Sequence, residues 1–197
     1  MLLNINWSFF YSLLLYNIYI HFSTKFNNIC RAKYPNLAKK SPRQFYHLRC
    51  KEPIFYISLK DTHLTTIGVK ENRFFSVNIP SVDMIQKTDY CGLISGKTTD
   101  KSQLFSSFYD GLGKAPMISE CPMNFLCKVV QTVPVCGFEV FFGEIVSTFV
   151  NKQCLTDGNP DPSKINPTLL MGFNYYSLGE SVGGVYKEGK KIDIRNQ

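Results

Sequence analysis

Residues 124–151 decide the fold: NFLCKVVQTV at 124–133, PVCG at 134–137 and FEVFFGEIVSTFVN at 138–151. Two long runs of β-branched and aromatic residues on either side of a four-residue Pro/Gly turn are typical of an antiparallel hairpin. The second run is apolar on both faces for much of its length. We therefore expect it to be covered on both sides, by a barrel interior and by a helix or a partner subunit.

Two shorter strands are predicted upstream of this hairpin. Residues 54–59, IFYISL, and 74–79, FFSVNI, are short apolar runs rich in aromatic and β-branched residues, as buried strands are. Between them, Thr62 is suited to cap a short helix that ends near Asn72. Strand, helix and strand therefore follow one another closely in this part of the chain.

Two further helices are expected between the second strand and the hairpin. One runs from residue 81 to about residue 93, and Asp100 is a good N-cap for another over residues 101–110, with Gly111 as its stop. Strands with short helices inserted between them predict a mainly β protein built as a closed or split β-barrel.

The positive charge is confined to the first quarter of the chain. The 197 residues suffice for one ordinary domain plus a tail, and the formal net charge is +7. Residues 1–51 contain eight Lys/Arg and no acidic residue, whereas residues 52–197 contain 14 Lys/Arg and all 15 Asp/Glu. A nearly neutral main domain gives no support for nucleic-acid binding.

The cysteine pattern predicts thiols rather than a metal site. None of the seven cysteines forms a C-x-x-C pair, and no histidine lies near two of them in the sequence. Zinc and iron–sulfur sites usually show tight ligand spacing, so neither is expected. An odd cysteine count without a clear secretory signal predicts reduced, mostly buried thiols in a cytoplasmic protein.

The N-terminal segment leaves three interpretations open. Residues 1–20 carry no charge, and a bilayer crossing needs roughly 20 mainly apolar residues. Basic residues follow from Lys25 onward, as in the cytoplasmic flank of a membrane span. The segment is a membrane anchor over residues 1–24, a pair of buried strands, or a stretch that is not native coding sequence. A membrane-anchored protein is thus the alternative to a cytoplasmic one.

Two places in the body offer groups to an anion, and no motif assigns a catalytic side chain. Lys101 follows Asp100 at an expected helix start, where backbone N–H groups favour a phosphate; its alternative is an ordinary solvated lysine. Residues 58–62, SLKDT, place hydroxyls and a cation just after a strand. No nucleophile elbow, Walker loop or G-x-G-x-x-G motif is present.

The stretch CKEPIFYISLKDTHLTTIGVKENRFFSVNIPS at 50–81 resembles the flavin reductase-like, FMN-binding split-barrel family, and its flavoredoxin-type members most closely. Further blocks follow in family order: DYCGLISGKTTDKSQLF, APMISECPMNFLCKVV, FFGEIV, CLTDGNPD and NYYSLGESVGGVYKEGK. The resemblance implies that residues 51–190 form a Greek-key split β-barrel with short inserted helices. It also implies a homodimer with FMN bound at the subunit interface.

The resemblance implies six cofactor-binding residues: Lys60, Thr62, Thr65, Asn78, Lys101 and Tyr176. The two threonines belong to a turn that approaches the phosphate side of the flavin, and Lys60 stands where relatives often have Arg. Lys101 matches the lysine that pairs with the FMN phosphate. The asparagine is structural or close to the cofactor, and the tyrosine either neighbours the isoalloxazine ring or packs in the core.

Residues 1–50 depart from the family pattern. Relatives carry N-I-x-T-x-A-W, with flavin-contacting residues, where this chain has Asn28-Ile29-Cys30-Arg31, and the following residues show no strand period. Divergence, replacement or a frameshift explains this departure. A frameshift predicts that the upstream coding DNA, translated in another frame, encodes a segment like N-I-x-T-x-A-W.

Two functions follow from the resemblance. The first is an FMN-dependent oxidoreductase, in which FMN takes electrons from NAD(P)H or from a reduced protein partner and passes them on. The second is a non-catalytic or vestigial FMN-binding barrel whose first strands no longer complete the cofactor site.

Overall fold

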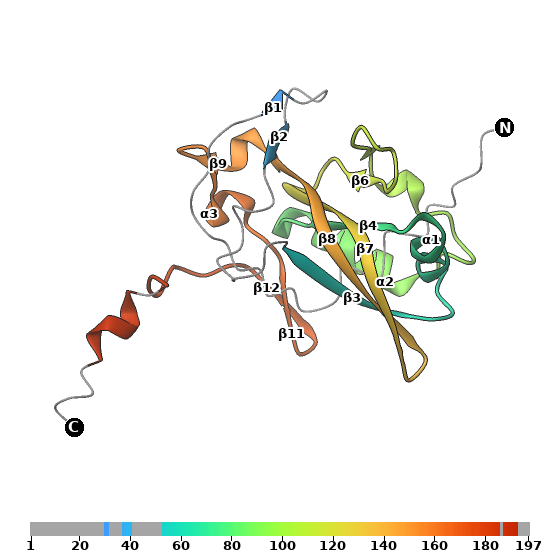
Figure 1. The fold of residues 1–197 in the computed structure, drawn as a ribbon. Helices are drawn as coiled ribbons and strands as arrows, with labels where there is room; N and C mark the ends of the chain where they lie inside the picture. The colour runs from blue at the N-terminus through green and yellow to red at the C-terminus, as the bar shows by residue number, and fades with distance from the viewer. Residues whose placement is uncertain (1–29, 32–36, 41–52, 186, 193–197) are drawn as a thin grey trace.

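The computed structural model describes residues 30–31, 37–40, 53–185 and 187–192 (Figure 1). The predictions of an anchor over residues 1–24 and of buried N-terminal strands before residue 25 lie outside the described residues. In the part of the chain that the structure describes, no helix is both long and apolar enough to span a membrane.

A six-stranded sheet carries the fold. Its strands pair in the order β1–β2–β8–β7–β4, and β3 also pairs with β8. The bounds are β1 Cys30–Arg31, β2 Leu37–Lys40, β3 Ile54–Lys60, β4 Phe74–Ile79, β7 Met123–Val135 and β8 Phe138–Asn151. Figure 1 shows the long β7–β8 hairpin crossing the centre of the body, with β3 and β4 beside it. The protein is a mainly β split barrel, as predicted.

The hairpin turn is shorter than expected. Cys136 and Gly137 alone connect the strands, and Pro134 and Val135 belong to β7, where they pair with residues of β8. The φ angles of Cys136 and Gly137 are 47° and 80°. Positive φ at both central residues gives a tight turn the twist that an antiparallel hairpin requires, so the expected four-residue turn is wrong.

Strand β8 pairs along both of its edges. One edge pairs with β7; on the opposite edge, residues 138–144 pair with β3 and residues 148–151 pair with β2, both antiparallel. The sequence shows no strand period around Leu37–Lys40, yet this segment forms β2. Backbone hydrogen bonds hold β2 against the part of β8 that follows the residues paired with β3. Such bonds do not require alternating side chains.

The first two helices match the prediction closely. Helix α1 spans Leu64–Asn72, with His63 rather than Thr62 at its N-cap position. The 3₁₀ turn η3, Val82–Met84, leads into α2, Ile85–Leu93.

The helix expected over residues 101–110 is wrong. Only the 3₁₀ turn η4, Ser102–Leu104, forms there, and Phe105 is extended, with φ −140° and ψ 153°. The Asp100 carboxylate accepts a hydrogen bond from the Ser102 N–H at 2.8 Å, which closes a local turn. Strand β5, Ser107–Phe108, then pairs with β6, Met117–Ile118, and Phe108 is buried. Tertiary packing therefore overrides the local helical pattern.

Short elements complete the chain after the hairpin: η5 Lys152–Cys154, β9 Leu155–Thr156, β10 Asn159–Pro160, α3 Pro162–Ile165, β11 Leu169–Met171, β12 Asn174–Tyr176 and η6 Glu188–Lys191. After β12 the chain runs away from the body (Figure 1).

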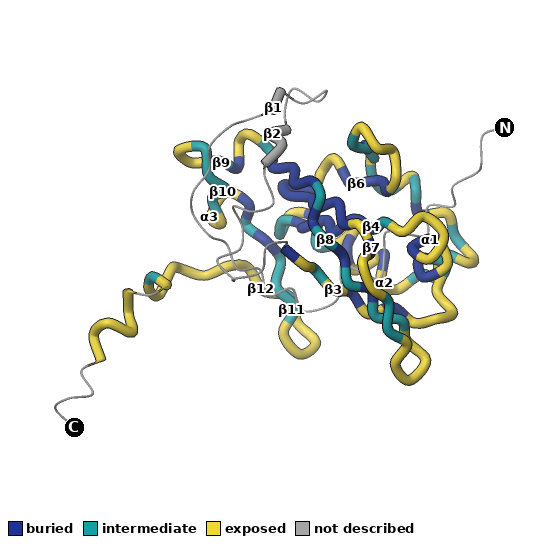
Figure 2. The backbone as a smooth tube through the Cα atoms, viewed as in Figure 1, coloured by how far each residue is buried: buried dark blue, intermediate teal, exposed yellow. Residues whose placement is uncertain are grey.

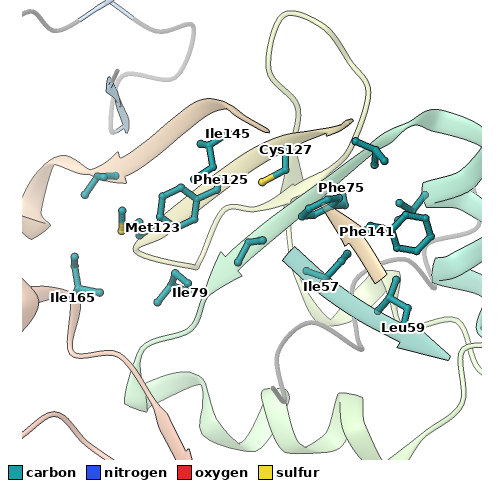
Figure 3. Close-up of a cluster of buried hydrophobic side chains, with 14 of the residues drawn as sticks. Ile57, Leu59, Phe75, Ile79, Met123, Phe125, Cys127, Phe141, Ile145 and Ile165 are labelled. Atoms are coloured by element: carbon teal, nitrogen blue, oxygen red, sulfur yellow. The ribbon is translucent and has the colours of Figure 1, made fainter. Parts of the chain in front are cut away.

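The core lies between the sheet strands and the turns that cover them. Figure 3 shows its central side chains: Ile57, Leu59, Phe75, Phe125, Phe141, Ile145 and Ile165, each at most 5% exposed. In Figure 2 the buried positions of the hairpin gather in the half away from its exposed tip. Among the described cysteines, four are buried, and Cys136 at the hairpin tip is exposed. Burial raises the pKa of the Cys127 thiol.

Candidate functional site

The turn between β3 and α1 gathers three of the predicted site residues. The Lys60 backbone carbonyl accepts hydrogen bonds from the His63 N–H at 3.0 Å and from the Thr66 Oγ1 at 2.6 Å. This fixes the turn between the end of the strand and the first turn of the helix. Lys60 and Thr62 are exposed, whereas Thr65 is buried. Thr66, which sequence analysis did not single out, holds the turn's shape.

The start of α1 is electrostatically suited to an anion. The His63 side chain makes no capping hydrogen bond, and no acidic residue occupies the first helical turn. The positive end of the helix dipole is therefore not neutralised by a side chain of that turn. Asp61 precedes the helix, and its N–H donates to the Gly137 carbonyl at 3.1 Å, which ties the turn to the hairpin tip. With the exposed Lys60 ammonium and Thr62 hydroxyl, this geometry fits a phosphate group.

Lys101 is held at the end of α2. Its side chain is only 4% exposed, and its Nζ donates to the Cys91 carbonyl at 2.7 Å. Burial lowers the pKa of the lysine. A cation at this position binds one of the last carbonyls of α2 and complements the negative end of the helix dipole. Because only the three-residue η4 turn follows Lys101 in place of the expected helix, the helix-start reason for phosphate binding there is lost, and the resemblance alone supports that role.

Asn78 makes structural contacts inside the barrel. Its Oδ1 accepts from the Ile118 N–H at 2.9 Å, and its Nδ2 donates to the Ser76 Oγ at 3.2 Å. Ser76 in turn donates to the Pro116 carbonyl at 2.6 Å. These bonds fasten the segment at β6 onto β4, so the contacts favour the structural alternative for Asn78.

A buried amide faces Asn78 across the sheet. Asn124 is its register partner in β7, and the Asn124 Nδ2 donates to the Cys121 carbonyl at 3.2 Å. Within the described residues, the Asn124 Oδ1 is buried without a hydrogen-bond partner. Buried carbonyl oxygens are normally satisfied by protein or water donors. Residues 123–127 are buried on both faces of the strand, so the sequence pattern gives no sign of the missing partner.

Tyr176 lies on β12 and is half-exposed, so it is not a core residue. Its neighbour Tyr175 donates from its hydroxyl to the Asp89 carboxylate at 2.9 Å, which links β12 to α2. Burial, followed by this contact with Asp89, raises the pKa of Tyr175. Sequence analysis missed Tyr175 because two adjacent tyrosines in a short strand do not reveal which one faces the body.

The structure therefore brings together Lys60, Thr62 and Thr65 in one turn. Lys101 lies at the α2 end, whereas Asn78 and Tyr176 belong to β4 and β12. The only predicted residues that share one local element are those of the β3–α1 turn, and we take this turn as the candidate site.

Comparison with known proteins identifies the family. The model of the flavin reductase like domain matches residues 44–177, more than half of the chain. The chain belongs to this family, which confirms the resemblance seen in the sequence.

Two solved structures of flavoredoxins are similar to this chain. Flavoredoxin from Methanosarcina acetivorans is 40% identical, with a TM-score of 0.70 over 73% of this chain and 78% of that chain. Flavoredoxin of Desulfovibrio vulgaris (Miyazaki F) is 28% identical, with a TM-score of 0.64 over 70% and 76% of the two chains. An uncharacterized protein of Archaeoglobus fulgidus is 30% identical over 117 residues, 58% of this chain and 64% of that protein. The chain thus spans less than two thirds of the length of the curated relatives it matches.

Proposed function

We propose that this protein is a flavoprotein oxidoreductase that binds FMN. Membership of the flavin reductase-like family and the similarity to two flavoredoxins support a flavin cofactor. The observation that carries the choice of FMN is the β3–α1 turn, where an uncapped helix start adjoins an exposed lysine and threonine. FMN ends in a phosphate monoester, which such a helix start favours.

In this proposal, the residues of the chain bind and orient the flavin. Lys60 and Thr62, with Thr65 beside them, hold the phosphate, while the bond from Thr66 to the Lys60 carbonyl keeps the turn in shape. The bound flavin would supply the redox chemistry, and the protein supplies binding, orientation and electrostatic tuning. The same proposal includes NAD(P)H or a reduced protein partner as electron donor, a homodimeric assembly and a cytoplasmic location.

The binding test compares FMN with riboflavin, which lacks the phosphate. We expect the purified protein to bind FMN more tightly than riboflavin, measured by quenching of flavin fluorescence. Lys60→Ala should weaken FMN binding by about 1.5–3 kcal/mol, the typical range for a charge-assisted hydrogen bond, and leave riboflavin binding unchanged. Lys114→Ala, at an exposed lysine between β5 and β6, is the matched control. A colourless protein that binds neither flavin contradicts the proposal.

A separate variant tests the predicted role of Lys101. If Lys101 pairs with the phosphate, Lys101→Ala weakens FMN binding by about 1.5–3 kcal/mol without affecting riboflavin. If its role is to bind the end of α2, the variant lowers thermal stability and leaves the ratio of the two flavin affinities unchanged. Thermal stability and the ratio of FMN to riboflavin affinity are also measured for Lys60→Ala, which shows how the loss of a phosphate contact changes them.

The second candidate is a non-catalytic FMN-binding barrel. It is favoured by the sequence before residue 50, which lacks the family's N-I-x-T-x-A-W segment. Adding NAD(P)H to the FMN-loaded protein under anaerobic conditions separates the two candidates. An oxidoreductase that uses this donor bleaches the flavin absorbance. A flavin that a strong chemical reductant bleaches but NAD(P)H does not excludes this donor and favours the second candidate.

A further inference from the structure

One face of the β3–β8–β7 sheet is open to solvent. Cross-strand partners lie on the same face of a sheet, and Tyr56 pairs with Phe142, which pairs in turn with Gln131. We define the open face as alternate positions from Ile54 to Lys60, from Phe138 to Glu144, and from Gln131 to Val135. All of these positions are exposed or half-buried.

The open face is largely apolar. Ile54 is 43% exposed, Tyr56 68% and Phe138 40%, and the Tyr56 and Phe142 rings lie 6.1 Å apart. The opposite face of the same strands holds Ile57, Leu59 and Phe141 of the core. A contiguous apolar sheet face of this kind, rimmed by the charged Lys60 and Glu144, is typical of an interaction surface.

A second unpartnered element follows β12. We define the arm as residues 177–185 and 187–192, which are exposed except for Gly184 (Figure 2). Val182 is fully exposed, and Val185 and Ile192 are 59% and 67% exposed. The backbone hydrogen bonds described for the arm are local, such as that from the Lys187 N–H to the Gly184 carbonyl at 3.0 Å.

We propose that the arm of one chain packs on the open face of a second copy, and that the second arm makes the same contact in return. Each copy carries one arm and one face, so a two-fold pair satisfies both at equal stoichiometry. The arm has 15 described positions and the open face has 11, so each copy contributes 26 positions to the proposed interface. Stable interfaces use roughly 20–30 residues per side, and the proposed contact matches that size.

The length of the arm is sufficient for this exchange. With η6 kept as a 3₁₀ turn and the rest extended, the arm reaches roughly 45 Å, whereas a folded body of about 135 residues is roughly 35–40 Å across. The arm leaves its own body at β12 and heads away from it (Figure 1). Since the open face ends at Lys60, the partner's arm would lie beside the candidate site. The exchange deepens the homodimer of the proposed function but does not depend on flavin.

Cross-linking the full-length protein tests this contact directly. A photoreactive benzoylphenylalanine replaces Val182, and equal amounts of unlabelled and ¹⁵N-labelled protein are unfolded together and refolded before illumination, so that the two populations exchange subunits. We expect mass spectrometry to find mixed-isotope cross-links between position 182 and the peptide containing Tyr56 or Phe142. Cross-links only within one isotope would show that the arm folds onto its own chain. Mixed cross-links to another surface, or none at all, would overturn the proposed face.

A surface variant tests the same contact by affinity. We expect Tyr56→Asp to weaken self-association by at least about tenfold in sedimentation equilibrium, as removal of a central interface aromatic does. Ile67→Asp is the matched control, since Ile67 is 48% exposed on α1 and lies outside the open face. Equal association of the two variants would overturn the proposal. Flavin binding is measured on the same samples, so a failure of the dimer and a failure of the cofactor site are distinguished.

Discussion

The two halves of the β7–β8 hairpin contain similar residues but occupy different environments. In the inner half, residues 123–129 and 143–151, β4 and β2 pair on either side, and residues 147–150 are buried on both faces. In the outer half, residues 131–142, only Phe141 is buried in the core, and the other positions are exposed or half-buried. The expectation that residues 138–151 are covered on both sides is correct for the inner half and wrong for the outer half of a single chain. The apolar content of a strand favours its burial, whereas the elements that pack against it decide which part is buried.

The largest effect should separate the two faces of β8. Phe141 is fully buried in the core, and Phe138, on the open face of the same strand, is 40% exposed. We expect Phe141→Ala to lower the free energy of unfolding by about 3–5 kcal/mol, because it removes buried surface and leaves a cavity. Phe138→Ala should cost less than about 1 kcal/mol in the monomer. Urea denaturation measures both, and similar losses would contradict the difference between the faces.

A smaller effect should come from the close packing of the inner half. A Cβ atom on Gly143 would lie 2.6 Å from the Cε1 and Cζ atoms of Phe75 and 2.9 Å from the Cys127 Cβ. We expect Gly143→Ala to destabilise the fold by about 1–3 kcal/mol through overpacking. Gly111→Ala serves as the control, because no atom lies within 4 Å of its added Cβ, and it should change stability by less than about 0.5 kcal/mol.

The hairpin tip should respond to backbone conformation alone. Gly137 has a φ of 80° and open space around it, so Gly137→Ala should cost about 1–2 kcal/mol from left-handed strain without any clash. At Cys136, φ 47°, asparagine tolerates the left-handed region better than cysteine does. Cys136→Asn should therefore raise the thermal midpoint. A rise with Gly137→Ala would rule out the two-residue turn.

The smallest effect concerns the loop beyond the inner end of the hairpin. Hydrogen bonds from Ser163 and Thr156 lower the pKa of Asp161 to about 2. A carboxylate whose pKa is lower in the folded state stabilises the fold above its unfolded pKa of about 3.9, and this stabilisation is lost as pH falls toward 2. Asp161→Asn keeps an oxygen to cap α3 but cannot titrate. The thermal midpoints of the two proteins should thus differ most at neutral pH and converge near pH 2.

Sequence patterns located most strands of the barrel because they are local. The runs at 54–59 and 74–79 and the hairpin at 124–151 carry their own β-propensity, and all form strands. The failed helix at 101–110 shows the limit of the same reasoning. Its spacing suits a helix, yet burial of Phe108 against Phe149 and pairing of β5 with β6 require an extended chain.

The candidate site was predicted only in part for a similar reason. Lys60, Thr62 and Thr65 are neighbours in sequence, so their shared turn follows from strand-then-helix order. The carbonyl that holds Lys101 belongs to Cys91, ten residues away, and no residue pattern reveals that bond.

By itself, the sequence determined the family, the strand order along the chain and the separation of charge between residues 1–51 and the rest. These depend on local residue identity and on ordered blocks. Tertiary structure alone decided that Lys101 binds a helix end, that Asn78 fastens β6, and that one sheet face stays open beside Lys60. The physical reason is that burial and hydrogen bonding depend on which distant segments meet, and a single strand's pattern does not encode its partners.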